Sequence, residues 1–379
     1  MSLVLDEHRG YLADEVRLAA FERAIAAIVM PGDVVIDLGS GTGILGLLAT
    51  RAGASRVYAV EETALGGLAR EIAAANNVGD RIQVVRGWST WVTLPELADV
   101  VVSDQIGHFG IEAGIFEYLP DARRRLLKPD GRTIPRSITW RCAPVECPPL
   151  RESIDFWRHE RAGFDFSAVV PPAEGSGYPI SLERDALLAP GVNIATAAAD
   201  VLPDSGVVSG EADFQIERRG TLDGIGGWFV AELAAGITFT NGPDSAQRIN
   251  RRQVVLPVSP LVVEPGDRVH LRIRFRPVTL MVDWNARVTA ADGTEKLRVR
   301  RSTFQGMLIA PEDLASKSPM ARPTLSERGQ AKRAALDMCD GTHTVRDIEA
   351  ALRRAYPGLL PTDEDASAFL AEVLGNDVS

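Results

Sequence analysis

One stretch near the N-terminus restricts the fold more than any other part of the chain. The sequence VVIDLGSGTGILGLL, residues 34–48, joins an apolar run typical of a buried strand to a helical pattern through a loop rich in glycine. Glycines are needed there because the chain must turn tightly and let a ligand approach its backbone closely. The order of strand, glycine loop and helix predicts an α/β domain that binds a nucleotide-like ligand.

The spacing of the glycines narrows the type of ligand. Gly39, Gly41 and Gly43 form a G-x-G-x-G pattern, which differs from the dinucleotide pattern G-x-G-x-x-G and lacks the lysine of a phosphate-binding loop. The next predicted strand, RVYAVE, ends at Glu61, where a carboxylate can bind both ribose hydroxyls. We therefore expect a nucleoside cofactor without a pyrophosphate.

The pattern of predicted secondary structure changes along the chain. Apolar strands and helices alternate at first, which predicts a buried parallel sheet. Short alternating segments then predict a β-rich domain, a Pro-rich passage predicts a linker, and helical patterns return at the end. We predict a Rossmann-like domain, a β-barrel-like domain, a linker and a small helical module at residues 1–135, 136–305, 306–325 and 326–379.

Composition argues against several classes of protein. The formal net charge of −10 and the pI near 5.2 argue against a general nucleic-acid binder. The three cysteines form neither a zinc spacing nor a disulfide framework, so we expect a reducing compartment and no metal. The N-terminus lacks a signal-peptide pattern, and no apolar run is long enough to span a membrane. We therefore expect a cytoplasmic protein.

Several stretches, in a common order, resemble one enzyme family. They include YLADEVRLAAFERAI, the glycine loop with RVYAVE, ADVVVSD, ARRRLLKPDGRTIP and VVLPVSPLVVEPGDRVHLRI. Over roughly residues 8–275 the chain is similar to the class I S-adenosylmethionine-dependent methyltransferases, and among them to the protein arginine methyltransferases. The resemblance implies S-adenosylmethionine as the cofactor and a two-domain fold of Rossmann-like and barrel-like parts.

The resemblance also implies roles for individual residues on the cofactor side. Arg17 would hold the methionine carboxylate, Asp37 and the loop from Gly39 to Gly43 would surround the methionine portion, and Glu61 would bind the ribose. The family usually has an acidic residue that meets the adenine amino group. Ser89 and Thr90 occupy that place here, so we expect the contact with adenine to come from them or from neighbouring backbone.

The acceptor side departs from the family pattern. Arginine methyltransferases grip the guanidinium with two glutamates on the loop after the fourth strand. The sequence SDQIGHFGIE offers Asp104 at the first place and Glu112 one residue before the second. The family's Thr-His-Trp triplet is also absent, because Ile249 and Asn250 stand where its histidine is expected.

His108 lies within the same loop, and its role has three alternatives. It could act as a general base, orient the acceptor or cap the loop. Asp104 is the stronger candidate for the acceptor site, because ligands of open α/β sheets bind at the carboxyl ends of strands. Glu112 and Glu117 could serve the acceptor site or lie on a solvated face of the following helix.

Two further segments suggest partners. FWRHERAGFDFS resembles the family's dimerisation arm, which we place near residues 150–190, and implies a homodimer. The C-terminal segment resembles a small winged-helix module that binds the leader peptide of a precursor by adding a strand to its sheet. The alternative for this segment is a helical appendage that only packs on the barrel or supports the dimer.

The sequence therefore predicts methyl transfer to a nitrogen or oxygen of a peptide or amino-acid-like natural product, positioned by Asp104 with Glu112 or His108. Arginine N-methylation by a rebuilt pair of Asp104 and Glu112 is the first alternative. A non-catalytic peptide-binding protein on a methyltransferase fold is the second.

Overall fold

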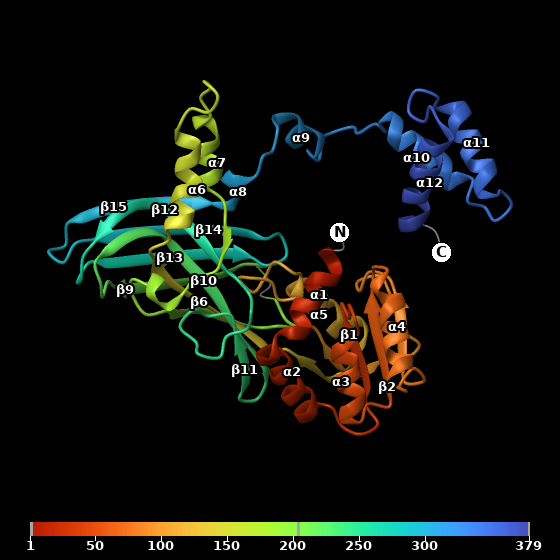
Figure 1. Cartoon of the computed structure of the whole chain (residues 1–379), viewed down its shortest axis with the longest axis horizontal. Helices are drawn as coiled ribbons and strands as arrows, with labels where there is room; N and C mark the ends of the chain where they lie inside the picture. Colours follow the sequence, from red (N-terminus) through yellow and green to blue (C-terminus); the bar gives the residue numbers. More distant parts are fainter. Residues whose placement is uncertain (1–2, 203–204, 378–379) are drawn as a thin grey trace. The chain divides into compact units, whose positions relative to one another are not determined.

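The computed structural model describes residues 3–202 and 205–377, which form two compact units (Figure 1). One unit ends at Leu308 and contains all the strands described below. The other begins at Ile309 and is helical in its described part.

The first part of the larger unit is an α/β domain built on a parallel sheet. The strand order is β3-β2-β1-β4-β5, and every pair in it is parallel. Its strands are β1 (Val34–Leu38), β2 (Arg56–Glu61), β3 (Ile82–Arg86), β4 (Ala98–Val102) and β5 (Leu127–Ile134). Its helices are α1 (Leu3–Ala13), α2 (Glu15–Ile28), α3 (Ile44–Ala52), α4 (Leu65–Ala75) and α5 (Ile115–Arg125).

The sheet order places a ligand site between two particular strands. After β1 the chain builds outward through β2 and β3, and it then crosses back to place β4 on the other side of β1. Ligands of open α/β sheets bind at such a reversal, at the carboxyl ends of the strands. The carboxyl ends of β1 and β4 therefore mark the expected site.

The N-terminal helical pattern is divided in the structure. Residues 10–30 carry one pattern in the sequence, but α1 ends at Ala13 and Asp14 caps the start of α2, its Oδ1 accepting a hydrogen bond of 3.0 Å from the backbone N–H of Arg17. Aspartate is favoured at this position because it satisfies a backbone N–H that the helix leaves unpaired. The break allows α1 to lie over the glycine loop as a separate element.

The second part of the larger unit is made of two antiparallel sheets. One sheet has the order β7-β12-β10-β6-β8, with β11 paired to β10, and the other has the order β15-β14-β13-β9. The strands are β6 (Ser137–Val145), β7 (Tyr178–Ile180), β8 (Val192–Ala198), β9 (Val208–Gln215), β10 (Gly220–Ala234), β11 (Ile237–Thr240), β12 (Gln253–Val263), β13 (Arg268–Arg276), β14 (Met281–Thr289) and β15 (Glu295–Ser302). The predicted fold class, a Rossmann-like domain followed by a barrel-like β domain, is confirmed.

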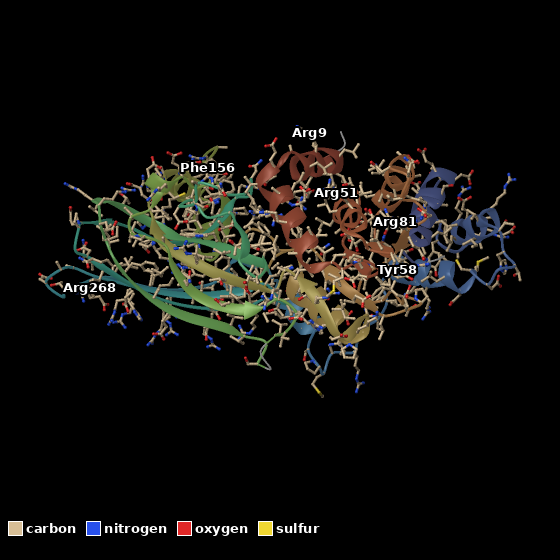
Figure 2. The ribbon with its side chains drawn as sticks, turned by 90° about the horizontal axis from the view of Figure 1, so that it is seen from below. Arg9, Arg51, Tyr58, Arg81, Phe156 and Arg268 are labelled. Atoms are coloured by element: carbon tan, nitrogen blue, oxygen red, sulfur yellow. The ribbon has the colours of Figure 1, made fainter. Side chains whose placement is uncertain are left out.

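A helical arm leaves the β domain between β6 and β7. It contains α6 (Pro148–Asp155) and α7 (Val170–Glu174), and a third short helix, α8 (Thr303–Gly306), follows β15. Phe156, which Figure 2 labels on this arm, is 44% exposed, and Phe164 is 68% exposed. The arm therefore presents aromatic surface to solvent.

The C-terminal unit has a small apolar core of its own. Its helices are α9 (Pro311–Ser316), α10 (Glu327–Asp337), α11 (Val345–Ala355) and α12 (Asp363–Asp377). Ile348, Leu352 and Leu370 are buried together in this core. The passage predicted as a linker contains α9, and residues 309–377 hold no strand to which a peptide strand could be added. The winged-helix resemblance is therefore not confirmed, and a helical module is what the structure contains.

Candidate functional site

The carboxyl ends of β1 and β4 are joined directly, as the strand order requires. The Ser103 hydroxyl, immediately after β4, donates a hydrogen bond of 2.9 Å to the carbonyl oxygen of Leu38, the last residue of β1. Both residues are buried. Asp37 and Asp104, which neighbour them in the chain, are thereby held on adjacent strand ends.

The glycine loop combines left-handed backbone angles with close contacts from neighbouring side chains. Gly39 and Gly41 have φ angles of +70° and +53°, in the left-handed region that favours glycine. A Cβ on Gly41 would lie 2.3 Å from Cε1 of His8, and a Cβ on Gly39 would lie 1.8 Å from the amide nitrogen of Gln105. Gly43, with φ of +81°, is the N-cap residue of α3 and has no side chain to cap the helix.

Asp37 is a buried carboxylate with one oxygen unused. Its Oδ2 accepts a hydrogen bond of 2.7 Å from the backbone N–H of Gly46, but its Oδ1 has no partner among the described residues. Burial raises the pKa of Asp37 to about 7, against the opposing effects of the Gly46 hydrogen bond and of Arg17. The nearby Ser40 hydroxyl is also buried and without a partner in the described structure. Such atoms fit a polar ligand that brings its own donors.

Glu61 holds the loop and retains room for a ligand. Its Oε2 accepts a hydrogen bond of 2.8 Å from the Gly41 N–H, and its Oε1 accepts bonds from the Thr63 N–H and hydroxyl. A carboxylate offers about four acceptor positions, so one is left for a ribose hydroxyl. A second acceptor position becomes available to the ribose if the Thr63 hydroxyl turns away from Glu61.

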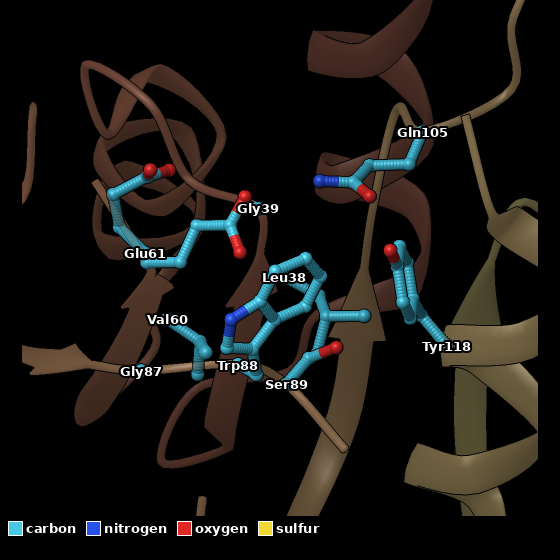
Figure 3. A pocket seen from close by; sticks show the side chains of 10 residues that line it. Leu38, Gly39, Val60, Glu61, Gly87, Trp88, Ser89, Gln105 and Tyr118 are labelled. Atoms are coloured by element: carbon cyan, nitrogen blue, oxygen red, sulfur yellow. The ribbon is translucent and has the colours of Figure 1, made fainter. Parts of the chain in front are cut away.

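Two cavities meet at the glycine loop. The first is the one drawn in Figure 3, where the Trp88 ring, Ser89 and Tyr118 lie around the ends of β1 and β2. The second, of about 500 Å³, extends under α1 and is within the range of small-molecule pockets. Residues lining both are Gly39, Glu61, Glu62, Gln105 and Tyr118. Because they share these residues, the two cavities form two halves of one cleft.

The second cavity includes residues that sequence reasoning missed. His8 and Tyr11 on α1 line it, as do Gln105 and Tyr118 near the loop after β4. Burial raises the pKa of Tyr11 to about 12, and the hydrogen bond that its hydroxyl donates to Glu7 adds to this effect. A histidine and a tyrosine three residues apart on one helix face were the available signal. The sequence does not reveal that this face covers the glycine loop.

Arg17 and Asp104 form a buried ion pair at the same cleft. The Arg17 Nε donates to the Asp104 Oδ2 over 2.5 Å, and the two side chains are 6% and 10% exposed. Burial alone would raise the pKa of Asp104, but Arg251 and Arg17 outweigh it and hold the pKa below its ordinary value. Asp104 is therefore an anion at neutral pH. Its Oδ1 is buried and has no partner among the described residues.

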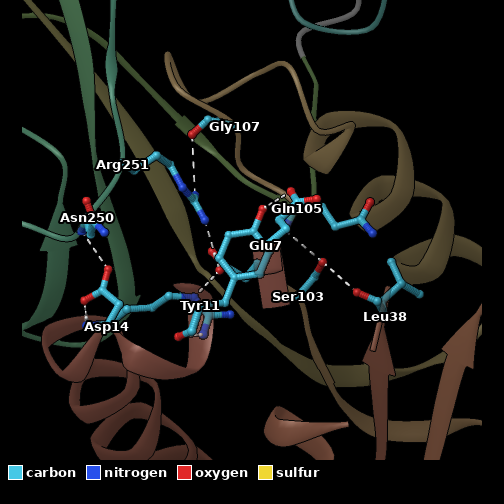
Figure 4. A network of polar contacts seen from close by, with 11 residues as sticks. Glu7, Tyr11, Asp14, Leu38, Ser103, Gln105, Gly107, Asn250 and Arg251 are labelled. Carbon is cyan, nitrogen blue, oxygen red and sulfur yellow. Dashed lines mark hydrogen bonds and ion pairs between the residues drawn. The ribbon is translucent and has the colours of Figure 1, made fainter. Parts of the chain in front are cut away.

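A second arginine reaches Asp104 from the β domain. The Arg251 Nη2 lies 3.2 Å from the same Oδ2, and the Arg251 Nη1 donates to the Gly107 carbonyl oxygen over 3.4 Å. Figure 4 shows Arg251 extending from the segment before β12 toward Tyr11 and Gly107. In the sequence this arginine is separated from Asp104 by 147 residues and was not predicted as a site residue.

The other predicted residues of the acceptor loop have structural partners. The Glu112 carboxylate accepts hydrogen bonds of 3.0 Å from the backbone N–H of Phe109 and of 3.2 Å from that of Ile111, so it turns back onto its own loop. Burial raises its pKa, although these backbone hydrogen bonds oppose the effect. Glu117 is exposed in the first turn of α5. Neither glutamate lines the two cavities of the cleft.

His108 contacts the β domain and does not line the cleft. Its Nδ1 lies 3.3 Å from the carbonyl oxygen of Arg252, and its own carbonyl oxygen accepts a hydrogen bond of 2.7 Å from the Asn241 side chain. Burial lowers the pKa of His108, and the charge of Arg252 lowers it further. This geometry agrees with the capping alternative better than with a general base.

The β domain holds the acceptor loop in place through an aromatic cluster. The Phe109 and Phe275 rings lie 5.6 Å apart, and the rings of Phe116 and Trp140 are stacked at 5.4 Å. Trp140 and Phe275, from β6 and β13, meet at 4.7 Å. Aromatic pairs at such distances stabilise by more than their buried area alone. The loop that carries Asp104 is therefore fixed by residues from both domains.

The remaining predictions concern adenine and metals. Ser89 lines the first cavity, whereas Thr90 lines neither cavity. The contact of either residue with adenine stays a prediction. Within residues 3–202 and 205–377, no group of three or more His, Cys, Asp or Glu side chains is placed to hold a metal ion. No helix in the described part of the chain has the length and apolarity needed to cross a membrane.

Comparison with known proteins points to one group of enzymes. Residues 18–138 match the family model described as ribosomal protein L11 methyltransferase. The chain is 28% identical over 287 residues to a probable protein arginine N-methyltransferase 6 of Arabidopsis thaliana, covering 73% of this chain and 63% of that protein. It is 41% identical over 143 residues to the protein arginine N-methyltransferase PRMT10 of Oryza sativa subsp. japonica, covering 37% and 38% of the two chains.

Similarity in fold covers a larger share of the chain than these two sequence matches do. A solved structure described as the Trypanosoma brucei PRMT1 enzyme-prozyme heterotetrameric complex with AdoHcy superposes with a TM-score of 0.69 at 21% identity. The match covers 78% of this chain and 97% of that one. The chain spans less than two thirds of the length of the two curated relatives above.

Proposed function

We propose that the chain is an S-adenosylmethionine-dependent methyltransferase of the arginine N-methyltransferase type. The similarity to protein arginine N-methyltransferases in sequence and fold supports this assignment. The cleft at the ends of β1 and β4 supports it independently, because its unpaired polar atoms fit the groups of this cofactor.

On the cofactor side, the carboxylate, ammonium and ribose groups of S-adenosylmethionine have counterparts that line the cleft or are buried beside it. Arg17 would bind the methionine carboxylate, Asp37 with its free Oδ1 would accept from the ammonium, and Glu61 would accept from the ribose. Trp88 and Tyr118 border the half of the cleft that remains for adenine. When bound, the cofactor would supply a methyl group on a sulfonium, whose carbon an aligned nitrogen lone pair can attack while the thioether leaves.

On the acceptor side, one observation supports arginine as the residue that receives the methyl group. Asp104 is a buried anion that lines the cleft and already pairs with two guanidinium groups, those of Arg17 and Arg251. A carboxylate in this place can hold an acceptor guanidinium with one nitrogen turned toward the methyl group. Transfer would join that nitrogen to the methyl carbon, break the carbon–sulfur bond to leave a neutral thioether, and pass one guanidinium proton to solvent water. Because its pKa is lowered, Asp104 serves to hold the cation.

Methyl transfer to a peptide panel tests this proposal. The panel contains a short arginine peptide and two matched peptides with lysine or glutamine in place of arginine, each supplied with labelled S-adenosylmethionine. We expect label only in the arginine peptide, recovered as methylarginine after hydrolysis. Label on an amine or hydroxyl would favour the broader nitrogen or oxygen acceptor that the sequence predicts. Binding of S-adenosylhomocysteine without any transfer would favour a non-catalytic peptide-binding protein.

We also propose a homodimer formed through the helical arm. Exposed aromatic side chains at the arm, Phe156, Phe164 and Phe166, favour contact with a second copy of the chain. A leader peptide at the C-terminal unit stays a prediction from the sequence resemblance. Removing residues from Ile309 onward and comparing transfer to peptides with and without a leader would test it.

A further inference from the structure

The solvent side of the sheet β15-β14-β13-β9 is rich in arginine, although the chain as a whole is acidic. Burial alternates along β13 and β14, so every second side chain of these strands points to solvent. The arginines on this side include Arg268, Arg272, Arg274, Arg287, Arg298 and Arg300, and all six are exposed. Because the net charge of the whole chain is −10, this face is a local concentration of positive charge.

A hollow of about 430 Å³ lies on this face, and we call it the arginine hollow. Its polar side chains come from three neighbouring strands and are His270, Arg272, Asn285, Arg287, Arg298 and Arg300. They form two rows across the sheet, since the residues of each row lie opposite one another in the strand register. Among the residues that the structure describes, no aspartate or glutamate lines the hollow. The hollow is therefore suited to an anion.

The edge strand β9 compensates the charge on one side of the hollow. Glu211 of β9 pairs with Arg272 over 2.8 Å, and Asp213 of β9 lies 2.9 Å from Nδ1 of His270. Both carboxylates are on the same side of the sheet as the hollow, beside β13. The side of the hollow formed by β13 therefore already has acidic partners within the protein.

The side formed by β14 and β15 keeps two uncompensated cations. Arg298 pairs with Glu295 over 2.6 Å, but neither Arg287 nor Arg300 forms an ion pair within residues 3–202 and 205–377. The Arg300 Nε donates only to the neutral Asn285 Oδ1, over 3.2 Å. Arg287 also lies directly opposite Arg298 in the register of β14 and β15, and like charges in such positions destabilise a sheet. Protection of the edge strand β15 does not require a cation on the inner strand β14.

We propose that the arginine hollow binds an extended acidic segment of a partner protein. Arg287 and Arg300 are diagonal neighbours on β14 and β15, a relation that separates two residues by about 7–8 Å. Alternate side chains of an extended peptide lie on one face about 7 Å apart. Two carboxylates with one residue between them can therefore each accept hydrogen bonds from one of these guanidinium groups. The inference does not depend on the proposed methyl transfer.

A nucleic acid fits this face less well than an acidic peptide. Sites for single-stranded nucleic acid combine positive charge with aromatic side chains on which bases stack. Among the described residues that line the hollow, the imidazole of His270 is the only ring. A long polyanion would also meet Glu211 and Asp213 on β9, whereas a short peptide needs only the positions that the hollow offers.

Binding of two short labelled peptides, measured by fluorescence polarisation, tests the proposal. One peptide alternates glutamate with threonine, and the other has glutamine in place of each glutamate. We expect the wild type to bind only the glutamate peptide, with an affinity that falls as salt is added. Arg287→Gln/Arg300→Gln should weaken this binding about tenfold, since an exposed ion pair contributes up to about fivefold.

Arg268→Gln/Arg274→Gln is the matched control, because it removes the same charge from the same face. Both arginines are exposed on β13, form no ion pair within the described part of the chain and lie outside the lining of the hollow; Figure 2 labels Arg268. This variant should bind the glutamate peptide nearly as the wild type does. Both double variants should fold, because exposed side chains are replaced and like charges are removed.

Four results would overturn the inference. The glutamate peptide could bind the wild type and Arg287→Gln/Arg300→Gln equally well, or it could bind neither. A melting temperature of Arg287→Gln/Arg300→Gln well below that of the control variant would assign these arginines a structural role. Tighter binding of an oligothymidylate than of the glutamate peptide would assign the hollow to nucleic acid.

Discussion

Replacing Asp104 with asparagine removes a charge from the centre of the site and keeps the size of the side chain. In the wild type this carboxylate pairs with both Arg17 and Arg251, whose side chains are 6% and 10% exposed. Removing one partner from a buried ion pair costs about 3–5 kcal/mol, because the other charge remains without compensation. We expect Asp104→Asn to lower the free energy of unfolding by about this amount, measured by chemical denaturation.

The same variant has a separate effect on methyl transfer. A hydrogen bond to a charged group contributes about 1.5–3 kcal/mol, which corresponds to roughly a 10- to 100-fold loss in kcat/KM for an arginine peptide. Calorimetry should show that S-adenosylhomocysteine still binds, because Arg17, Asp37 and Glu61 are unchanged. Full transfer activity and full stability in Asp104→Asn would refute the assignment of Asp104 as the group that holds the cations.

Glu117→Gln is the matched control for this experiment. Glu117 is an acidic residue exposed on α5, just after the acceptor loop. Because it lines neither cavity of the cleft, its replacement should leave both transfer and stability close to the wild type.

Three further predictions concern the cofactor cleft and the arm. Gly41→Ala should weaken S-adenosylhomocysteine binding in calorimetry, because its φ of +53° strains any other residue and its Cβ would push the His8 ring, 2.3 Å away, out of the cleft wall, whereas Gly67→Ala, with nothing within 4 Å, should bind normally. Without cofactor, the stability of the protein should fall as the pH rises from about 4 to about 7, because Asp37 binds a proton more tightly in the folded state. Thermal denaturation should show a smaller dependence in Asp37→Asn, and an identical profile would contradict the raised pKa. Phe164→Ser should convert a dimer into a monomer of 40.9 kDa in light scattering, while Phe304→Ser, exposed on α8, should not; a monomeric wild type would exclude the dimer.

The cofactor half of the site could be predicted from sequence because its residues are close to one another along the chain. Asp37, the glycine loop and Glu61 lie on two consecutive strands and the turn between strand and helix, where backbone geometry restricts the residue types. The structure places Gly39, Gly41 and Glu61 in the lining of one cleft, whereas Asp37 is buried behind the glycine loop and lines neither cavity. Arg17 was predicted from the family resemblance alone, and it lies at the same cleft.

The acceptor half could not be predicted in the same way. The loop SDQIGHFGIE was identified, but the direction of its side chains depends on contacts with residues from β6, β13 and the segment before β12. Glu112 turns onto backbone N–H groups of its own loop, which no residue spacing indicates. The covering of the glycine loop by His8 and Tyr11 depends on the break at Asp14.

The sequence by itself determined the parallel α/β domain, its glycine loop and the carboxylates at the ends of its strands, because these follow from local periodicity and backbone sterics. Only the tertiary structure decided which charge faces Asp104. Arg251 stands 147 residues further along, in an irregular segment, and its guanidinium reaches the loop because two domains pack together there. Local sequence patterns carry no information about such a contact, since the burial and charge balance that stabilise it arise only when distant segments meet.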